Sequence, residues 1–164
     1  MYNVGDYVVY KRDVCVVKEI NKKYYKDMDY YKLEPINDNS LKLDVPVNNK
    51  YIRNIISREE LNTIIDNIPN IDVIKCSDKY IENDYKSLMH SGRHEDLIKI
   101  IKTTYLRNKE RIDNKKKVTD KDIMYFKKAE EYLYTEVSIV LGVSYEEAKT
   151  YVIDKVEKKV SWYG

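Results

Sequence analysis

The sequence is poor in glycine, in cysteine and in long apolar runs, and each shortage excludes a class of protein. With four glycines in 164 residues, the chain has no glycine-rich phosphate loop, and it has no G-x-S-x-G motif. Cys15 and Cys76 are its two cysteines. They form no disulfide framework and fit a reducing cytosol. No apolar run approaches the roughly 18 residues of a membrane helix, and the N-terminus lacks an apolar signal segment, so we expect neither feature.

The chain as a whole also lacks a large excess of charge of one sign. It has 30 basic and 28 acidic residues, a net charge of +2, which by itself does not argue for nucleic acid. Locally, residues 99–117 contain eight basic residues, namely Lys99, Lys102, Arg107, Lys109, Arg111, Lys115, Lys116 and Lys117. This cluster is either an electrostatic footprint for nucleic acid or a solvated helix face running into a loop, and charge alone favours the solvated face.

The first part of the chain has the pattern of short strands separated by polar turns. Alternating apolar residues predict strands within 2–10, 14–20, 29–34, 41–45 and 52–56. Pro46 ends the fourth of these strands or marks a sheet edge. Antiparallel strands of this length predict a small β-barrel over residues 1–56. A module this small is expected to depend on its neighbour for stability.

The rest of the chain has the signals of five capped helices. Ser57-Arg58-Glu59-Glu60 is a capping box ahead of an apolar stripe that Pro69 ends. Further helices are expected at about 77–91, 94–112, 119–141 and 144–160. Ser77-Asp78 would cap the first of these four and Thr119 to Asp122 the third, which Gly142 would end. The sequence therefore predicts an α+β chain, with a five-helix bundle over 57–160 and a tail at 161–164 that contains Trp162.

Residues that could carry out chemistry are few and scattered. His90 and His94 are four residues apart, as metal ligands on a helix can be, but Ser91-Gly92 between them predicts a helix break. Neither cysteine has an evident histidine partner. We therefore expect no enzyme, no metal and no cofactor. A metal-dependent or thiol enzyme built on His90, His94 and Cys76 is kept as an alternative.

Five short motifs occur in a fixed order along the chain. They are Val4-Gly5-Asp6-Tyr7-Val8-Val9-Tyr10, Tyr30 to Leu33, Val45-Pro46, residues 52–61, and Ser91-Gly92. The CarD/CdnL-type bacterial transcription regulators carry V-G-D-x-V-V-Y, Y-x-x-L, V-P, V-R-x-V/I-x-S/G-x-E-E-L and S-G in the same order. The chain resembles this family over nearly its whole length.

The resemblance implies a function for each part of the chain. Residues 1–56 would be a Tudor-like RNA-polymerase-interaction domain that pairs with the protrusion lobe of the polymerase β subunit through a barrel edge strand. Residues 57–160 would be a helical DNA-binding domain at the upstream edge of the promoter bubble. It would contact phosphates and wedge an aromatic residue into the minor groove, and so modulate the stability of the open complex. We expect a monomeric, cytoplasmic, nucleoid-associated bacterial protein.

The same resemblance assigns residues to the two interfaces. The polymerase-binding candidates are Lys22, Lys23, Lys42, Asp44 and Val45. Relatives commonly have a basic residue where this chain has Asp44, so the contact would use a swapped charge pair or depend on the lysines. The DNA-binding candidates are Tyr80, Lys86, Lys99, Lys102, Arg107, Lys109, Arg111 and Lys121.

Tyr80 is the aromatic residue nearest to the position of the family's tryptophan wedge, and it is either a weaker wedge or a core residue. Three hypotheses follow: a regulator that wedges promoter DNA, a polymerase-binding adaptor that does not, and the metal or thiol enzyme. The sequence leaves the direction of regulation open.

Overall fold

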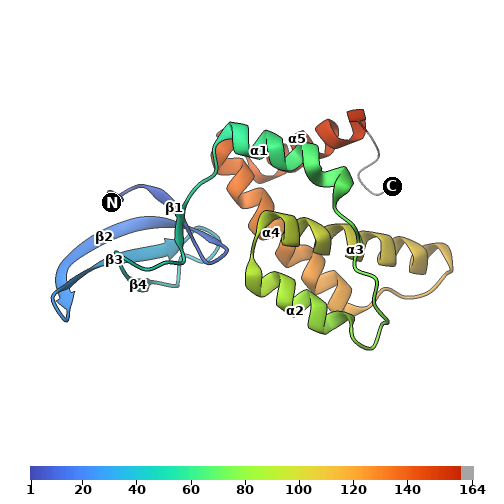
Figure 1. Cartoon of the computed structure of the whole chain (residues 1–164), viewed down its shortest axis with the longest axis horizontal. Coiled ribbons are helices and arrows are strands. Elements are labelled where there is room, and N and C mark those ends of the chain that lie inside the picture. Colours follow the sequence, from blue (N-terminus) through green and yellow to red (C-terminus); the bar gives the residue numbers. More distant parts are fainter. Residues whose placement is uncertain (160–164) are drawn as a thin grey trace. The chain divides into compact units, whose positions relative to one another are not determined.

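The structure, a computed structural model, describes residues 1–159 and separates the chain into two compact units, Met1–Ile55 and a second unit that begins at Ile56. The first unit is a β-sheet and the second is a set of packed helices (Figure 1). The predicted α+β class is confirmed. The predicted tail at 161–164, with Trp162, lies outside the described residues.

The sheet unit contains one five-stranded antiparallel sheet in the order β4-β3-β2-β1-β5. Its strands are β1 (Tyr7–Tyr10), β2 (Asp13–Tyr25), β3 (Met28–Pro35), β4 (Leu43–Pro46) and β5 (Ile52–Asn54). The predicted barrel is corrected here, because the sheet is not closed. The short strands β4 and β5 pair only inward, with β3 and β1, so each of them leaves an open edge.

The alternation of residues in the strands gives the sheet one apolar face. Its core consists of Val8, Cys15, Val17, Tyr31, Leu33 and Val45. Tyr31 is buried in this core, and its hydroxyl accepts a hydrogen bond from the N–H of Tyr2 at 3.1 Å. Burial raises the pKa of the Cys15 thiol to about 12, which makes it a packing residue and not a nucleophile.

The helical unit follows the sequence signals closely. Its elements are α1 (Arg58–Asn67), the short 3₁₀ helix η1 (Ile68–Asn70), α2 (Ile81–Ser91), α3 (His94–Asp113), α4 (Asp120–Leu141) and α5 (Tyr145–Lys159). The capping box at Ser57 is confirmed, and Gly142 ends α4 in the left-handed conformation, with φ 67°. None of the described helices has the length and apolar content to cross a membrane.

Two buried polar contacts fix segments onto the helical core. The carboxylate of Glu136 on α4 accepts a hydrogen bond from the N–H of Ile56 at 3.1 Å, so it fixes the start of the unit. The N–H of Ile74 donates to Thr103 Oγ1 at 2.9 Å, which ties the segment between η1 and α2 to α3. Tyr85 and Tyr134 are among the largest fully buried side chains, as expected for a chain rich in tyrosine and poor in phenylalanine.

Candidate protein and nucleic-acid interfaces

The strand β4 forms an open edge of the sheet, and the register shows which of its backbone groups are available. Tyr31 lies opposite Val45 and Lys32 lies opposite Asp44, while the N–H of Val47 donates to the carbonyl of Asp29 at 3.1 Å. Hydrogen-bonded and non-hydrogen-bonded pairs alternate along an antiparallel ladder. The N–H and C=O of Asp44 therefore point away from β3, where another strand could pair with them.

The polymerase-binding candidates do not form one cluster. Lys42 is ion-paired with Glu34 at one end of β3, and Lys22 lies 3.3 Å from Asp29 at the other end. Val45 has a buried side chain in the sheet core, and its backbone pairs with Tyr31, so it anchors β4 and is not free to contact a partner. Asp44 and Lys23 are exposed. These positions are instead spread along the length of the β3–β4 pair.

Three of the predicted DNA-binding cations converge on one loop aspartate. Arg107 Nη1 lies 2.6 Å from Asp78 Oδ1, Arg111 Nη2 lies 3.2 Å from Asp78 Oδ2, and Lys121 Nζ donates to the Asp78 carbonyl at 2.9 Å. We call these four residues the Asp78 clamp. The hydrogen bond from Arg107 is the main cause that holds the pKa of Asp78 below its ordinary value. The clamp fixes the loop ahead of α2 to both α3 and α4.

Arg107 also reaches inward, to a fully buried carboxylate. Its Nε lies 3.3 Å from both oxygens of Asp122. Asp122 also accepts hydrogen bonds from the Tyr85 hydroxyl at 2.7 Å and from Thr119 Oγ1 at 2.8 Å. Burial, followed by the Asp122 hydrogen bond, raises the pKa of Tyr85. Arg107 therefore neutralises a buried charge between three helices.

Lys102 is a second correction to the predicted DNA interface. Its side chain belongs to the core, with the residue only 6% exposed. Its Nζ donates to the carbonyls of Ile68 at 3.1 Å and Ile71 at 2.7 Å, at the start of η1 and just past its end. Burial lowers the pKa of Lys102. An ammonium in this position cannot reach a phosphate, so Lys102 joins η1 to α3 and is not a DNA contact.

The remaining DNA-binding candidates lie at or near the surface. Tyr80, directly before α2, is 54% exposed, so the alternative that it is a core residue is wrong. The ammonium of Lys79 lies 5.4 Å from the centre of the Tyr80 ring. Lys86 is exposed on α2, at 4.0 Å from Glu82. On α3, Lys109 is exposed and Lys99 is half-buried. The candidates thus separate into an exposed set and a set that stabilises the fold.

The geometry gives the enzyme alternative no support. His90 and His94 lie on different helices, because α2 ends at Gly92 in the left-handed conformation, which confirms the predicted break. His94 Nε2 lies 2.8 Å from Glu136 Oε1. Partial burial and the neighbouring Asp84 raise the pKa of the Cys76 thiol, which opposes its activation. Among residues 1–156, whose side chains are described, there is no group of three metal-ligating side chains.

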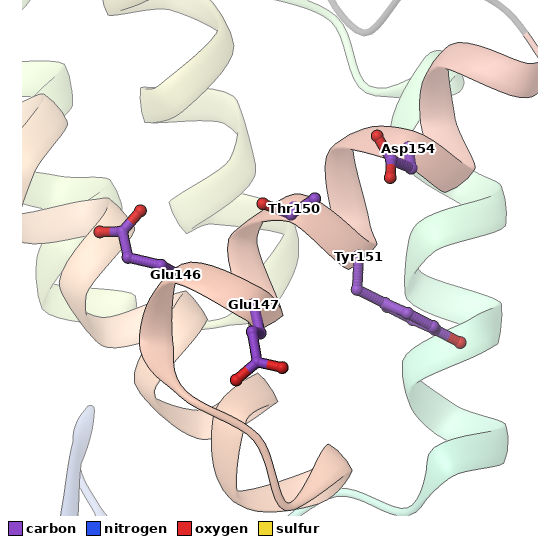
Figure 2. Close-up of a pocket in the computed structure, with 5 residues that line it drawn as sticks. All are labelled: Glu146, Glu147, Thr150, Tyr151 and Asp154. Carbon is purple, nitrogen blue, oxygen red and sulfur yellow. The ribbon is translucent and has the colours of Figure 1, made fainter.

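A shallow hollow on α5 was not predicted from the sequence. Its lining residues are Glu146, Glu147, Thr150, Tyr151 and Asp154, all from this one helix. Figure 2 shows them spaced along α5, with the Tyr151 ring extending toward α1. The three carboxylates project separately and do not converge on a point, so we assign no ligand to the hollow.

Sequence reasoning missed three residues that matter. Asp78 had the pattern of a helix cap, and its ion pairs with Arg107 and Arg111 join positions about thirty residues apart. Asp122 was recognised only as part of the Thr119 capping segment, although its capping contact to Thr119 is present. Tyr24 went unassigned beside the predicted Lys22 and Lys23. The signal for Tyr24 was visible in the sequence, as aromatic residues placed between lysines.

The geometry thus offers an antiparallel sheet with an open edge, joined to a helical unit. Residues 2–58 match the family model of the CarD-like/TRCF RID domain. This match covers the sheet unit and is consistent with a protein of the CarD/CdnL type. The RID domains of that family are protein-interaction domains for the RNA polymerase β subunit and not catalytic ones. No curated protein matches the chain.

Proposed function

We propose that this protein is a bacterial transcription regulator. It binds the RNA polymerase β subunit through its RID domain and upstream promoter DNA through its helical unit, and so modulates the stability of the open complex. The observation that carries the proposal is the family match at residues 2–58. The described helices contribute an exposed aromatic residue and exposed lysines that suit a DNA contact.

On the polymerase side, the β4 edge is the surface that best fits a protein partner. A strand of the β protrusion lobe would pair with the outward N–H and C=O of Asp44 and extend the sheet. Lys42 and Asp44 would provide charges beside that strand, while Val45 anchors β4 to the core. Lys22 and Lys23 lie toward the other end of the β3–β4 pair and would contact the rim of the β protrusion lobe.

On the DNA side, the proposed contacts are Tyr80, the exposed Lys86 and Lys109, and the half-buried Lys99. Lys86, Lys99 and Lys109 would neutralise phosphates without reading sequence, which makes binding sensitive to salt and tolerant of sequence. Tyr80 would insert at an unstacked base step, an interaction that favours an opening duplex over a closed one. Arg111 and Lys121 are bonded to Asp78 in the Asp78 clamp, and these bonds would limit their contact with DNA.

The Tyr80→Ala variant tests the wedge. We expect the lifetime of the open complex to fall about five- to thirtyfold, because stacking of one base on an aromatic ring is worth about 1–2 kcal/mol. The measurement is the decay of preformed open complexes after addition of a competitor. Tyr80→Phe keeps the ring and should keep the lifetime. Met124→Ala, at an exposed apolar residue of α4, serves as the control for surface truncation.

The second candidate is a polymerase-binding adaptor that does not wedge DNA. It is favoured by the loss of cations from the predicted interface, since Lys102 is buried and Arg107 is paired with Asp78 and Asp122. An unchanged lifetime in Tyr80→Ala, with binding to the β subunit intact, would support this candidate and contradict the wedge.

A further inference from the structure

The end of the β2–β3 hairpin extends beyond the rest of the sheet. The strand β1 pairs with Asp13–Val16 of β2, and β4 pairs with Tyr30–Leu33 of β3. Past these positions β2 and β3 pair with each other as far as Tyr25 and Met28, as a two-stranded ribbon (Figure 1). A ribbon of this kind has two solvated faces, so its side chains are available to a partner.

This end carries tyrosines and lysines together. Residues 22–26, which we call the hairpin tip, read Lys-Lys-Tyr-Tyr-Lys and are all exposed. Tyr24 is 57% exposed and Tyr25 is 56% exposed, and neither belongs to the sheet core. The ammonium of Lys26 lies 5.3 Å from the centre of the Tyr25 ring. Within residues 1–159, neither Lys23 nor Lys26 takes part in an ion pair.

The tip is also held in a defined conformation. Asp29 accepts a hydrogen bond from the N–H of Lys23 at 2.9 Å and lies 3.3 Å from Lys22 Nζ, at the register shift between Asn21 and Tyr25. The N–H of Lys23, followed by Lys22, holds the pKa of Asp29 below its ordinary value. The turn residues Lys26 and Asp27 both have positive φ, 50° and 58°, as a type I′ hairpin turn requires. A fixed backbone lowers the entropy cost of placing the tyrosines against a partner.

We propose that the hairpin tip binds single-stranded DNA, with Tyr24 and Tyr25 stacking on bases and Lys26 neutralising phosphates. Aromatic rings interleaved with cations are how proteins bind single strands without reading their sequence. A protein partner fits less well, because lysine is depleted at the centres of protein interfaces and here it borders both rings. The choice of DNA over RNA rests on the proposed function, which brings the protein to melted promoter.

Binding of a short fluorescent oligothymidylate to the full chain, followed by anisotropy at two salt concentrations, tests the proposal. We expect salt-sensitive binding that weakens about tenfold in Tyr24→Ala and again in Tyr25→Ala. Lys26→Glu should weaken binding and flatten its salt dependence. The matched control is Tyr51→Ala: Tyr51 is 52% exposed with the Lys50 ammonium 5.1 Å from its ring, but it lies away from the tip. That variant should bind like wild type.

Several results would overturn the proposal. They are a wild-type chain that does not bind the oligonucleotide, tip variants that bind it as wild type does, and an oligouridylate that binds at least about tenfold tighter. Tip variants that lose the β subunit but keep the oligonucleotide would make the tip a polymerase contact instead. Failure of the proposed function has a different signature, because a chain unable to bind the β subunit can still bind the oligonucleotide. Thermal unfolding should be unchanged in every tip variant, since the tip lies outside the core.

Discussion

Replacing Arg107 by alanine is expected to lower the free energy of unfolding of the helical unit by about 3–5 kcal/mol. The variant leaves Asp122 fully buried with its charge opposed only by the neutral hydroxyls of Tyr85 and Thr119. It also removes the shortest side-chain contact of the Asp78 clamp. The measurement is urea unfolding followed by the far-ultraviolet circular dichroism of the helices.

Two companion variants make the Arg107 result specific. Lys109→Ala, at an exposed position of the same helix, should change the free energy of unfolding by less than about 0.5 kcal/mol. Asp122→Asn combined with Arg107→Ala should destabilise the unit by less than the sum of the two single changes, because the charge that Arg107 neutralises is gone. A loss below about 1 kcal/mol in Arg107→Ala would contradict the buried pair. Arg107 would then return to the set of DNA contacts.

Replacing Asp44 by proline is expected to weaken binding of the chain to the RNA polymerase β subunit by about a hundredfold. The substitution removes an N–H that points away from β3, so the pairing of β4 within the sheet stays intact. It leaves an acceptor on the incoming strand unsatisfied and places a ring in the path of that strand. Titration of the full chain with the purified β subunit measures the change.

Asp44→Ala is the matched control for the proline variant. It removes the same carboxylate but keeps the outward N–H, so it should bind within about threefold of wild type if rim charges contribute little. Equal losses of affinity for the β subunit in Asp44→Ala and Asp44→Pro would assign the contact to the side-chain charge, as in a swapped charge pair. Wild-type affinity in Asp44→Pro would rule out strand addition at β4.

Local signals in the sequence predicted local structure well. The Ser57 capping box, the Thr119 cap and the Gly142 stop each depend on residues within one turn of a helix, and each is present. Strand alternation found the five strands for the same reason. It placed the end of β2 too early, at residue 20. Lys22 to Tyr25 are all exposed, so they show no alternation of buried and exposed residues.

The errors come from contacts between residues far apart in the chain. The second helix was expected from Ser77, but α2 begins at Ile81, because Arg107 and Arg111 hold Asp78 outside it. The barrel was expected from strand count, whereas closure depends on whether the edge strands meet. A lysine in a basic stretch has the pattern of a DNA contact, and only the position of η1 shows that Lys102 is buried.

The candidate site was predictable in part for the same reasons. The sequence pointed to Tyr80 but left its exposure open, because the helix was expected from Ser77, whereas Tyr80 lies ahead of α2 and is exposed. Residue type does not show which cations are exposed. Arg107 and Lys109 lie on the same helix, and what the neighbouring helices place beside each of them decides its exposure. The charge count of residues 99–117 therefore overstated the cations available to DNA.

The most direct test of the account is calorimetric titration of the full chain into the purified RNA polymerase β subunit. We expect a complex of one chain with one β subunit that is retained in the Tyr80→Ala variant, because the proposed contact lies in residues 2–58 and not at Tyr80. Absence of any complex at every concentration that calorimetry can reach would contradict it.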